Sequence, residues 1–414
     1  MSTSPPTTSS PPLLTLDEAL GRLLGALGPV ASTDVVSTFD ALGRVLAEDV
    51  VSTLDVPPAD NSSMDGYALR SADVPAAGTV LAVSQRIAAG SVGTALAAGT
   101  AARIFTGAQV PSGADAVVMQ ERCSAVEGGV RIDAAPKPGE WIRRRGEDVR
   151  AGSVVLPAGT RLTPQALGMA ASVGVGSLRV APRPRVALFS TGDELAMPGE
   201  ILKPGAIYNS NRYTLRALVQ ALGCDCEDLG IVPDDLASTR DALRRAAAGN
   251  DLIVTCGGVS VGEEDHLKPA VQAEGRLDLW SIAIKPGKPL AFGQVRRPAG
   301  GPAWFIGLPG NPVSSFVTFM LAVRPFLLRL QGATDVAPRA IPQRADFDWP
   351  KPDRRREFLR VRRNAEGGLD VFANQSSGVL TSVVWGDGFV DVPAGTSFRR
   401  GDTVRYLPFA ELLG

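Results

Sequence analysis

The sequence predicts a multidomain protein in which a central parallel α/β domain is combined with β-rich regions on both sides. Three observations lead to this fold class. The chain has 414 residues, which is enough for two to four domains. Strand and helix patterns alternate between residues 185 and 255, as they do in a parallel sheet with crossover helices. Outside that stretch, short apolar runs are separated by Gly and Pro, which is typical of small β domains.

The chain begins with a polar tail and a helix. Residues 1–12 are rich in Ser, Thr and Pro and contain no basic or apolar run, so they predict a disordered tail and no signal peptide. Thr15 and Glu18 have the spacing of a capping box, and the leucines from Leu16 to Leu27 share one helical face. Gly28 fits the C-terminal end of this helix.

Each later region has its own pattern. The first β-rich region carries apolar runs at residues 79–83, 102–105, 116–119 and 154–156. In the α/β domain, buried-type strands at 185–190, 229–232 and 251–255 alternate with helices at 211–222 and 236–248. Further strands at 279–284, 290–292 and 304–306 precede a long helix at 312–330. After a linker, a small β-barrel or sandwich is expected from strands at 357–361, 369–372, 389–392 and 403–407.

Composition excludes several classes of function. A formal net charge of −1 argues against a general binder of nucleic acid or anionic membranes. One histidine, His266, excludes multi-histidine metal sites, and we assign it no catalytic role. Four cysteines suit a reducing compartment, and Cys224 and Cys226 are expected to be two thiols at a strand start, not half of a zinc site. No long apolar stretch is free of charge, so we expect a cytoplasmic protein.

Three motifs follow predicted strands of the α/β domain, where ligands bind in open sheets. They are STGDE at 190–194, GGVSVG at 257–262 and GLPGNP at 307–312. Each alone also suits an ordinary tight turn, but together they favour a phosphate site built from backbone N–H groups. Asp265, directly after the second motif, and Asp234, at another strand end, are candidate ligands for Mg²⁺ at a diphosphate.

The run IKPGKP at 284–289 places Lys285 and Lys288 between prolines that restrict the backbone. Two pre-positioned ammonium groups suit a multiply charged oxyanion, although a solvated basic turn would have the same sequence. No P-loop is present, and no GxGxxG follows a strand. The sequence therefore argues against an ordinary kinase, ATPase or dinucleotide enzyme.

Taken in order, these motifs resemble the MoeA family, the molybdopterin molybdenumtransferases. The resemblance extends from about Leu13 to the C-terminus and also rests on MDGYA at 64–68, IFTGA at 104–108, PSGADA at 111–116, RGEDV at 145–149 and LPGNPVS at 308–314. Two departures stand out: Cys256 precedes GGVSVG where relatives often carry Ser or Ala, and Trp385 lies in a tail segment that lacks the usual pattern.

The resemblance implies that molybdate is inserted into the dithiolene of adenylylated molybdopterin, giving molybdenum cofactor and AMP. It assigns Mg²⁺ to Asp265 and Asp234, and the adenylylated pterin to Glu194 and to Gly257, Gly258, Ser260 and Gly262. It assigns molybdate to Lys285, Lys288, Ser314, Arg360 and Ser377, further substrate contacts to Pro309 and Pro312, and roles on the N-terminal arm to Asp65, Thr106 and Asp148. The attacking group, a molybdate oxygen or water, stays open.

The family fold implies four units: a linker domain at 13–58 and 149–183, an inserted β-rich domain at 59–148, an α/β domain of the MogA type at 184–331, and a C-terminal β-barrel at 332–414. It also implies a homodimer whose cleft lies between the α/β domain of one subunit and the inserted domain of the other. The expected partners are the preceding adenylyltransferase and acceptor molybdoenzymes.

Two other functions stay open from sequence. A molybdopterin adenylyltransferase would share the α/β domain, but residues 13–180 and the C-terminal barrel argue against it. A scaffold relative without catalysis would keep its partner binding after loss of Lys285 and Asp265.

Overall fold

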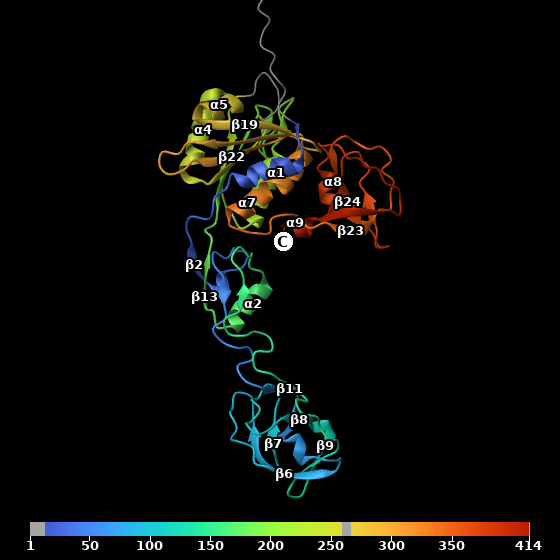
Figure 1. Ribbon diagram of the computed structural model, residues 1–414. Helices are drawn as coiled ribbons and strands as arrows, with labels where there is room; N and C mark the ends of the chain where they lie inside the picture. The colour runs from blue at the N-terminus through green and yellow to red at the C-terminus, as the bar shows by residue number, and fades with distance from the viewer. Residues whose placement is uncertain (1–12, 259–265, 414) are drawn as a thin grey trace, which may run out of the picture.

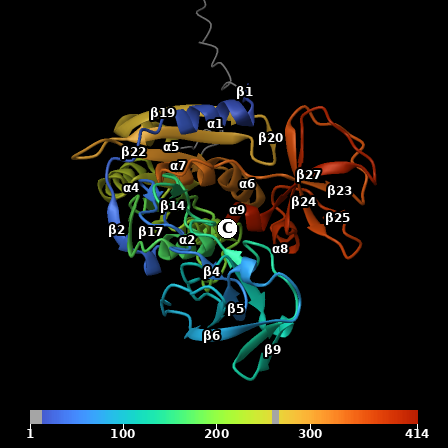
Figure 2. The same cartoon turned by 60° about the horizontal axis from the view of Figure 1, so that its bottom comes forward.

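The computed structural model describes residues 13–258 and 266–413. The molecule is elongated, with the α/β domain and the C-terminal β domain side by side at one end (Figure 1). A narrow linker leads from them to a β-rich lobe at the other end, and the turned view in Figure 2 shows the same groups of elements. The predicted tail at 1–12 lies outside the described residues.

A seven-stranded mixed sheet forms the α/β domain, in the order β1-β19-β21-β22-β18-β14-β17. Its strands are β1 (Leu13–Leu14), β14 (Arg185–Thr191), β17 (Asp225–Val232), β18 (Leu252–Cys256), β19 (Gly275–Ile282), β21 (Pro289–Val295) and β22 (Ala303–Leu308). The four strands from β22 to β17 are parallel, whereas β21 runs antiparallel to both β22 and β19. The predicted parallel sheet is therefore mixed at one side, because residues 283–288 are too few for a crossover between β19 and β21.

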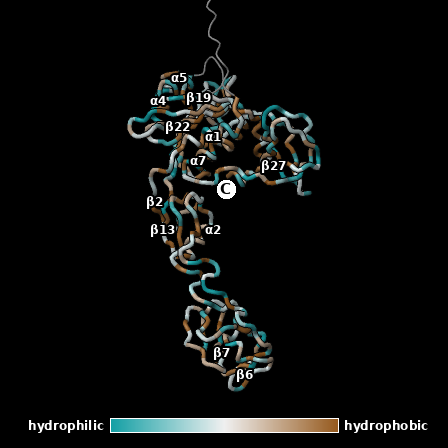
Figure 3. Tube along the Cα trace, viewed as in Figure 1, coloured by the Kyte–Doolittle hydropathy of each residue, from teal (hydrophilic) through white to brown (hydrophobic). Residues whose placement is uncertain are grey.

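Both faces of this sheet are buried, as the continuous apolar strands predict. Along β14, Val186 and Leu188 pack with one cluster, and Ala187 and Phe189 pack with the other. The helices that cover the first face are α1 (Leu16–Gly25), α3 (Ser210–Ala221), α6 (Pro312–Thr318) and α7 (Arg324–Leu330). The helices that cover the second face are α4 (Leu236–Gly249) and α5 (Leu267–Glu274). The trace through β22 and α7 is largely hydrophobic (Figure 3).

Two helices differ in detail from their prediction. The capping box of α1 is confirmed, since Glu18 N–H donates to Thr15 Oγ1 at 3.2 Å and Thr15 N–H donates to Glu18 Oε2 at 2.8 Å. The helix ends at Gly25 and is capped by Ala26, so Gly28 is not its cap. The long helix predicted at 312–330 is instead α6 (Pro312–Thr318), a π-helical turn (Phe319–Val323) and α7 (Arg324–Leu330). Pro325 has no N–H to continue the hydrogen-bond ladder, which explains the interruption.

Two passes of the chain form the linker side by side. Its elements are β2 (Asp34–Ser37) paired with β13 (Ser177–Val180), β3 (Val50–Val51) paired with β12 (Val154–Leu156), the 3₁₀ turn Thr38–Asp40, and α2 (Pro164–Ser172). Near the distal lobe, β4 (Asn61–Ser62) pairs with β11 (Ile142–Arg143). The distal lobe holds β5 (Gly66–Leu69), β6 (Thr79–Ile87), β7 (Thr100–Ile104), β8 (Ala116–Met119), β9 (Cys123–Val126) and β10 (Gly129–Ile132) in one sheet, with 3₁₀ turns at Ser71–Asp73 and Gln120–Arg122.

The C-terminal β domain closes into a small barrel. Its strands are β23 (Ile341–Arg344), β24 (Arg356–Arg363), β25 (Leu369–Val371), β26 (Gly388–Val392) and β27 (Thr403–Pro408), with α8 (Thr381–Trp385) and α9 (Phe409–Leu413). A bridge between Ala345, directly after β23, and Leu369 of β25 links the last strand of the path to the strand that pairs with β24. One strand comes from the α/β domain: β20 (Ile284–Lys285) pairs in parallel with β24. Trp385 packs within this domain, against Phe372 and the guanidinium of Arg362.

One helix in the described residues, Pro312–Leu330, is long and apolar enough to cross a membrane. Most of it, 89 %, is buried inside the protein, so it is a core helix of the α/β domain here.

The buried Arg324 side chain joins α7 to the C-terminus of the chain. It is 7 % exposed and donates to the backbone carbonyls of Leu412, Val336 and Glu411. We expect Arg324→Met to lower the free energy of unfolding by about 2–4 kcal/mol, because these buried carbonyls lose their donor. Denaturant titration measures this loss, and Arg339→Met, which removes an exposed ion pair with Asp335, is the control that should change little.

The four thiols are predicted to react slowly in the native protein. Burial raises the pKa of Cys123 and Cys226 to about 11 and that of Cys224 to about 12, and it also raises the pKa of Cys256. At pH 8 only about 0.1 % of a thiol of pKa 11 is thiolate, so alkylation by iodoacetamide should accelerate about tenfold per pH unit up to pH 11. Fast alkylation of native Cys226 at pH 8 would contradict this burial, whereas all four thiols should react readily in denaturant.

Candidate functional site

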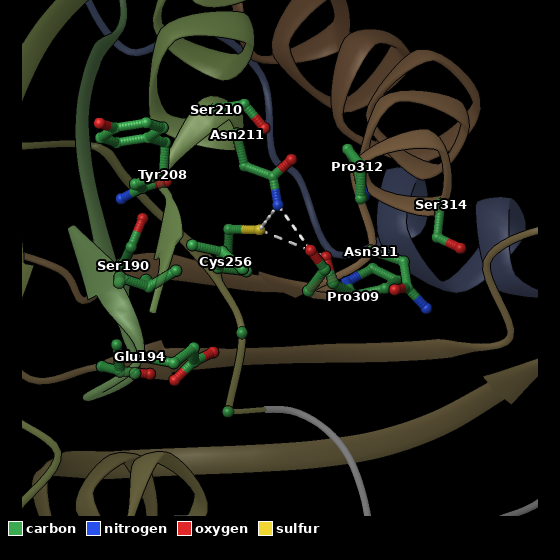
Figure 4. A pocket seen from close by; sticks show the side chains of 18 of the residues that line it. Ser190, Glu194, Tyr208, Ser210, Asn211, Cys256, Pro309, Asn311, Pro312 and Ser314 are labelled. Carbon is green, nitrogen blue, oxygen red and sulfur yellow. Dashed lines mark hydrogen bonds between the residues drawn. The ribbon is translucent and has the colours of Figure 1, made fainter. Parts of the chain in front are cut away.

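The carboxyl ends of β14, β18 and β22 open onto a pocket of about 770 Å³ (Figure 4). Parallel strands end at the same edge of a sheet, so the loops that follow them come together although they are distant in sequence. Seven of the predicted site residues line this pocket: Glu194, Asp234, Gly257, Gly258, Pro309, Pro312 and Ser314. Ser260, Gly262 and Asp265 lie outside the described residues.

The loop after β18, which begins at Gly257, requires glycine for a steric reason. Gly257 and Gly258 have φ values of 95° and 65°, in the left-handed region that side chains disfavour. A Cβ at Gly257 would also lie 2.9 Å from the carbonyl oxygen of Thr191, which belongs to the neighbouring strand. The loop can therefore approach the end of β14 closely only without a side chain.

Cys256 lies buried in the wall of the pocket and contacts the first turn of α3 and the loop before α6. Asn211 Nδ2 donates to Cys256 Sγ at 2.9 Å and to the Gly310 carbonyl at 2.7 Å, and Cys256 Sγ donates to the Pro309 carbonyl at 3.3 Å (Figure 4). Burial raises the pKa of the thiol, so it is protonated at neutral pH and is not a nucleophile. The cysteine instead connects the start of α3 to the loop that opens α6.

Sequence reasoning missed several polar residues of the pocket. Asn209, Asn211 and Ser190 line it. Ser190 Oγ and Asn209 Nδ2 are buried and have no hydrogen-bond partner among the described residues, so a bound ligand would satisfy them. Ser190 was available from the STGDE motif, but Asn209 and Asn211 lie at the start of a helix that gave only a packing pattern.

The described pocket lining carries negative side chains and no Lys or Arg. Its carboxylates are Glu194 and Asp234. A diphosphate placed between them would be repelled unless a cation accompanied it. Magnesium is usually held by one or two carboxylates together with substrate phosphates, so this lining fits a magnesium-bound diphosphate. Within the described residues, no three His, Cys, Asp or Glu side chains form a ready metal cluster.

The two predicted lysines, Lys285 and Lys288, lie in different surroundings. Neither belongs to the described pocket lining, but Pro289, which follows Lys288, lines the pocket. Lys285 Nζ lies 2.8 Å from Glu357 Oε1 and 3.3 Å from Asp353 Oδ2, and the hydrogen bond with Glu357 raises its pKa. Lys288 is exposed. The IKPGKP run therefore holds one paired and one exposed ammonium group.

Arg360 is a buried cation of the barrel. Its side chain is 1 % exposed and donates to Ser382 Oγ at 3.2 Å and to the carbonyls of Phe358 and Ser376, and burial lowers its pKa to about 10. Among the described residues no carboxylate pairs with it, which leaves its charge available to an anion.

The segment between β25 and α8, which carries Ser377, reaches the pocket. The Val313 N–H at the start of α6 donates to the Ser377 carbonyl at 3.0 Å, and the next residue, Gly378, lines the pocket. The barrel thus supplies backbone groups next to the loop between β22 and α6, at the edge of the pocket.

Three predicted residues lie away from this pocket. Asp65 and Thr106 meet in the distal lobe, where Thr106 N–H and Oγ1 donate to Asp65 Oδ1 at 2.8 and 2.7 Å and lower the pKa of that carboxyl. Asp148 lies where the lobe joins the linker, beside a second pocket of about 580 Å³ that is rich in arginine. Within one chain the structure does not bring these residues to the first pocket (Figure 1).

Comparison with known protein families covers most of the chain. Residues 14–174 match the MoeA N-terminal region (domain I and II), residues 187–329 match a probable molybdopterin binding domain, and residues 343–409 match the MoeA C-terminal region (domain IV).

Individual relatives match over nearly their full length. A molybdopterin molybdenumtransferase of Haemophilus influenzae is 38 % identical over 97 % of this chain and 100 % of its own. Molybdopterin molybdenumtransferase 2 of Mycobacterium tuberculosis is 38 % identical over 84 % of this chain and 89 % of its own. The crystal structure of the molybdopterin biosynthesis moeA protein of Pyrococcus horikoshii is 31 % identical, with a TM-score of 0.82 over 96 % of this chain and 100 % of that one. The motifs, the fold and these matches agree: the chain belongs to the MoeA family.

Proposed function

We propose that this protein is a molybdopterin molybdenumtransferase, which inserts molybdate into adenylylated molybdopterin and releases AMP in a magnesium-dependent reaction. The observation that carries the proposal is the convergence of three loops on one pocket, in a chain that matches relatives of that name from end to end. The pocket is large enough for a pterin with a linked phosphate, and pockets of this size commonly bind ligands of that class.

The pterin and its diphosphate are proposed to lie along the three loops. Ser190 Oγ and Asn209 Nδ2 supply buried polar atoms that a heterocycle can satisfy. Asp234, with Asp265 of the sequence, which lies outside the described residues, would hold Mg²⁺. The metal ion would neutralise the diphosphate and polarise the phosphorus–oxygen bond that is cleaved. Glu194 also lines the pocket and would contribute an acceptor for substrate N–H or O–H groups.

Molybdate is proposed to bind where the barrel meets the α/β domain. Molybdate and the diphosphate are both anionic, so they approach each other only if protein cations offset the repulsion. Arg360 is buried without a carboxylate partner in the described structure. Lys288 directly precedes Pro289 of the pocket, and Lys285 lies in the same IKPGKP run. Ser314 lines the pocket at the start of α6, and its hydroxyl would be a donor. The Ser377 carbonyl accepts from Val313 N–H there, so the Ser377 hydroxyl is a second candidate donor. The chain needs no protein nucleophile for this chemistry, which agrees with the protonated thiol of Cys256.

The distal lobe is proposed to act on a second copy of the chain. Asp65 and Thr106 lie far from the pocket of their own subunit (Figure 1). In a homodimer, the distal lobe of one subunit would cover the pocket of the other and complete it. We also propose that the enzyme works in the cytoplasm, receives its substrate from an adenylyltransferase and passes its product to molybdoenzymes.

The first test is molybdate-dependent release of AMP from adenylylated molybdopterin in the presence of Mg²⁺. Wild type should release AMP only with molybdate, and Lys285→Ala and Asp265→Ala should each slow release by roughly 10²-fold, because each removes charge stabilisation. The exposed Arg245 of α4 gives a control cation outside this machinery, and Arg245→Ala should keep wild-type activity. If wild type releases no AMP but makes adenylylated product from ATP and molybdopterin, the protein is an adenylyltransferase and the proposal is wrong.

The second test is the magnesium requirement of that reaction. Asp225 and Asp234 lie at opposite ends of the β17 region, with only Asp234 at the pocket. Asp234→Ala should raise the Mg²⁺ concentration for half-maximal activity by about tenfold or more, whereas Asp225→Ala should leave it unchanged. Equal magnesium curves for both variants would remove Asp234 from the metal site.

A further inference from the structure

Lys285, which the proposed function places at the oxyanion, is already paired with two carboxylates of the barrel. We propose that Asp353 competes with the oxyanion: both bind the same N–H donor of the Lys285 ammonium. Asp353 thereby weakens oxyanion binding and sets its affinity. This inference rests on the proposed function and concerns a residue to which the sequence motifs assign no role.

The contact with Glu357 is the permanent one. Backbone pairing of β20 with β24 sets Lys285 opposite Glu357, and the Nζ–Oε1 distance is 2.8 Å. Glu357 is only 2 % exposed, and its other oxygen accepts from Trp349 Nε1 at 2.9 Å. A buried carboxylate that lost the lysine would keep an uncompensated charge, so Glu357 retains its partner.

The contact with Asp353 is the exchangeable one. It is longer, at 3.3 Å, and the side chains of Lys285 and Asp353 are 43 % and 20 % exposed, so solvent and ions reach them. Asp353 also has a cation of its own: Arg355 donates from Nε and Nη2 to its two oxygens, each at 3.1 Å. Because Arg355 balances its charge, Asp353 can release Lys285 at little cost.

The charge balance explains why this matters. Lys285 and Arg355 carry two positive charges, and Asp353 and Glu357 carry two negative ones, so the group is neutral. An incoming dianion is attracted to Lys285 only when Asp353 breaks its contact with Lys285 and stays paired with Arg355. The ammonium has three N–H donors, and the displaced bond to Asp353 is then available to an oxyanion oxygen.

The experiment compares molybdate binding by calorimetry, with molybdate alone, and the KM for molybdate in the AMP-release assay. Asp353→Asn removes the competing charge and should lower the Kd and KM about twofold to fivefold, the range expected for a partly exposed ion pair. Arg355→Met leaves Asp353 with Lys285 as its remaining cation and should raise both constants. Damage to the barrel alone would weaken binding in both variants, so the opposite signs distinguish the two explanations.

Asp346 provides the matched control. It lies in the same barrel and pairs with a nearby arginine, Arg344, at 2.8 Å, but it has no lysine partner in the described structure. Asp346→Asn should leave molybdate binding unchanged. An unchanged or higher Kd in folded Asp353→Asn overturns the inference while wild-type activity upholds the proposed function. A wild type that neither binds molybdate nor releases AMP overturns both.

Discussion

The parallel pairing of β14, β18 and β22 is the constraint on which the rest of the site depends. Each strand is buried on both faces, so its register is set by the packing of α3 and α6 on one face and α4 and α5 on the other. The strands therefore end together, and the loops after them line one pocket. Gly257 permits this convergence because a side chain there would strike the end of β14.

The barrel is tied to this sheet by strand pairing and by charge. β20 leaves the sheet and joins the barrel, so the IKPGKP run belongs to both domains at once. Lys285 meets Glu357 across that pairing, and Arg324 holds the C-terminal helix against α7. These contacts fix the orientation of the barrel, which allows the tail at Ser377 to hydrogen-bond to the first turn of α6. The molybdate region that we propose is thus an interdomain site.

The elongated linker separates two parts of the predicted machinery. Its paired strands, β2 with β13 and β3 with β12, keep the distal lobe away from the pocket of its own chain (Figure 1). Asp65 and Thr106 are hydrogen-bonded to each other, and neither lines the pocket of the α/β domain. The homodimer that we propose would account for the roles that the resemblance assigns to residues at both ends of one molecule.

Local sequence patterns determined much of the fold and the location of the site. The capping box at Thr15, the buried strands of the α/β domain and the loops at their ends depend on nearby residues, so they could be predicted. The interrupted helix at Phe319–Val323 and the antiparallel β21 depend on backbone hydrogen bonding that periodicity does not report. The network of Asn211 with Cys256, and the carboxylates that pair with Lys285, join residues 45 to 72 positions apart. Only tertiary structure decides such contacts, because the charge state and the accessibility of a side chain depend on which distant residues pack against it.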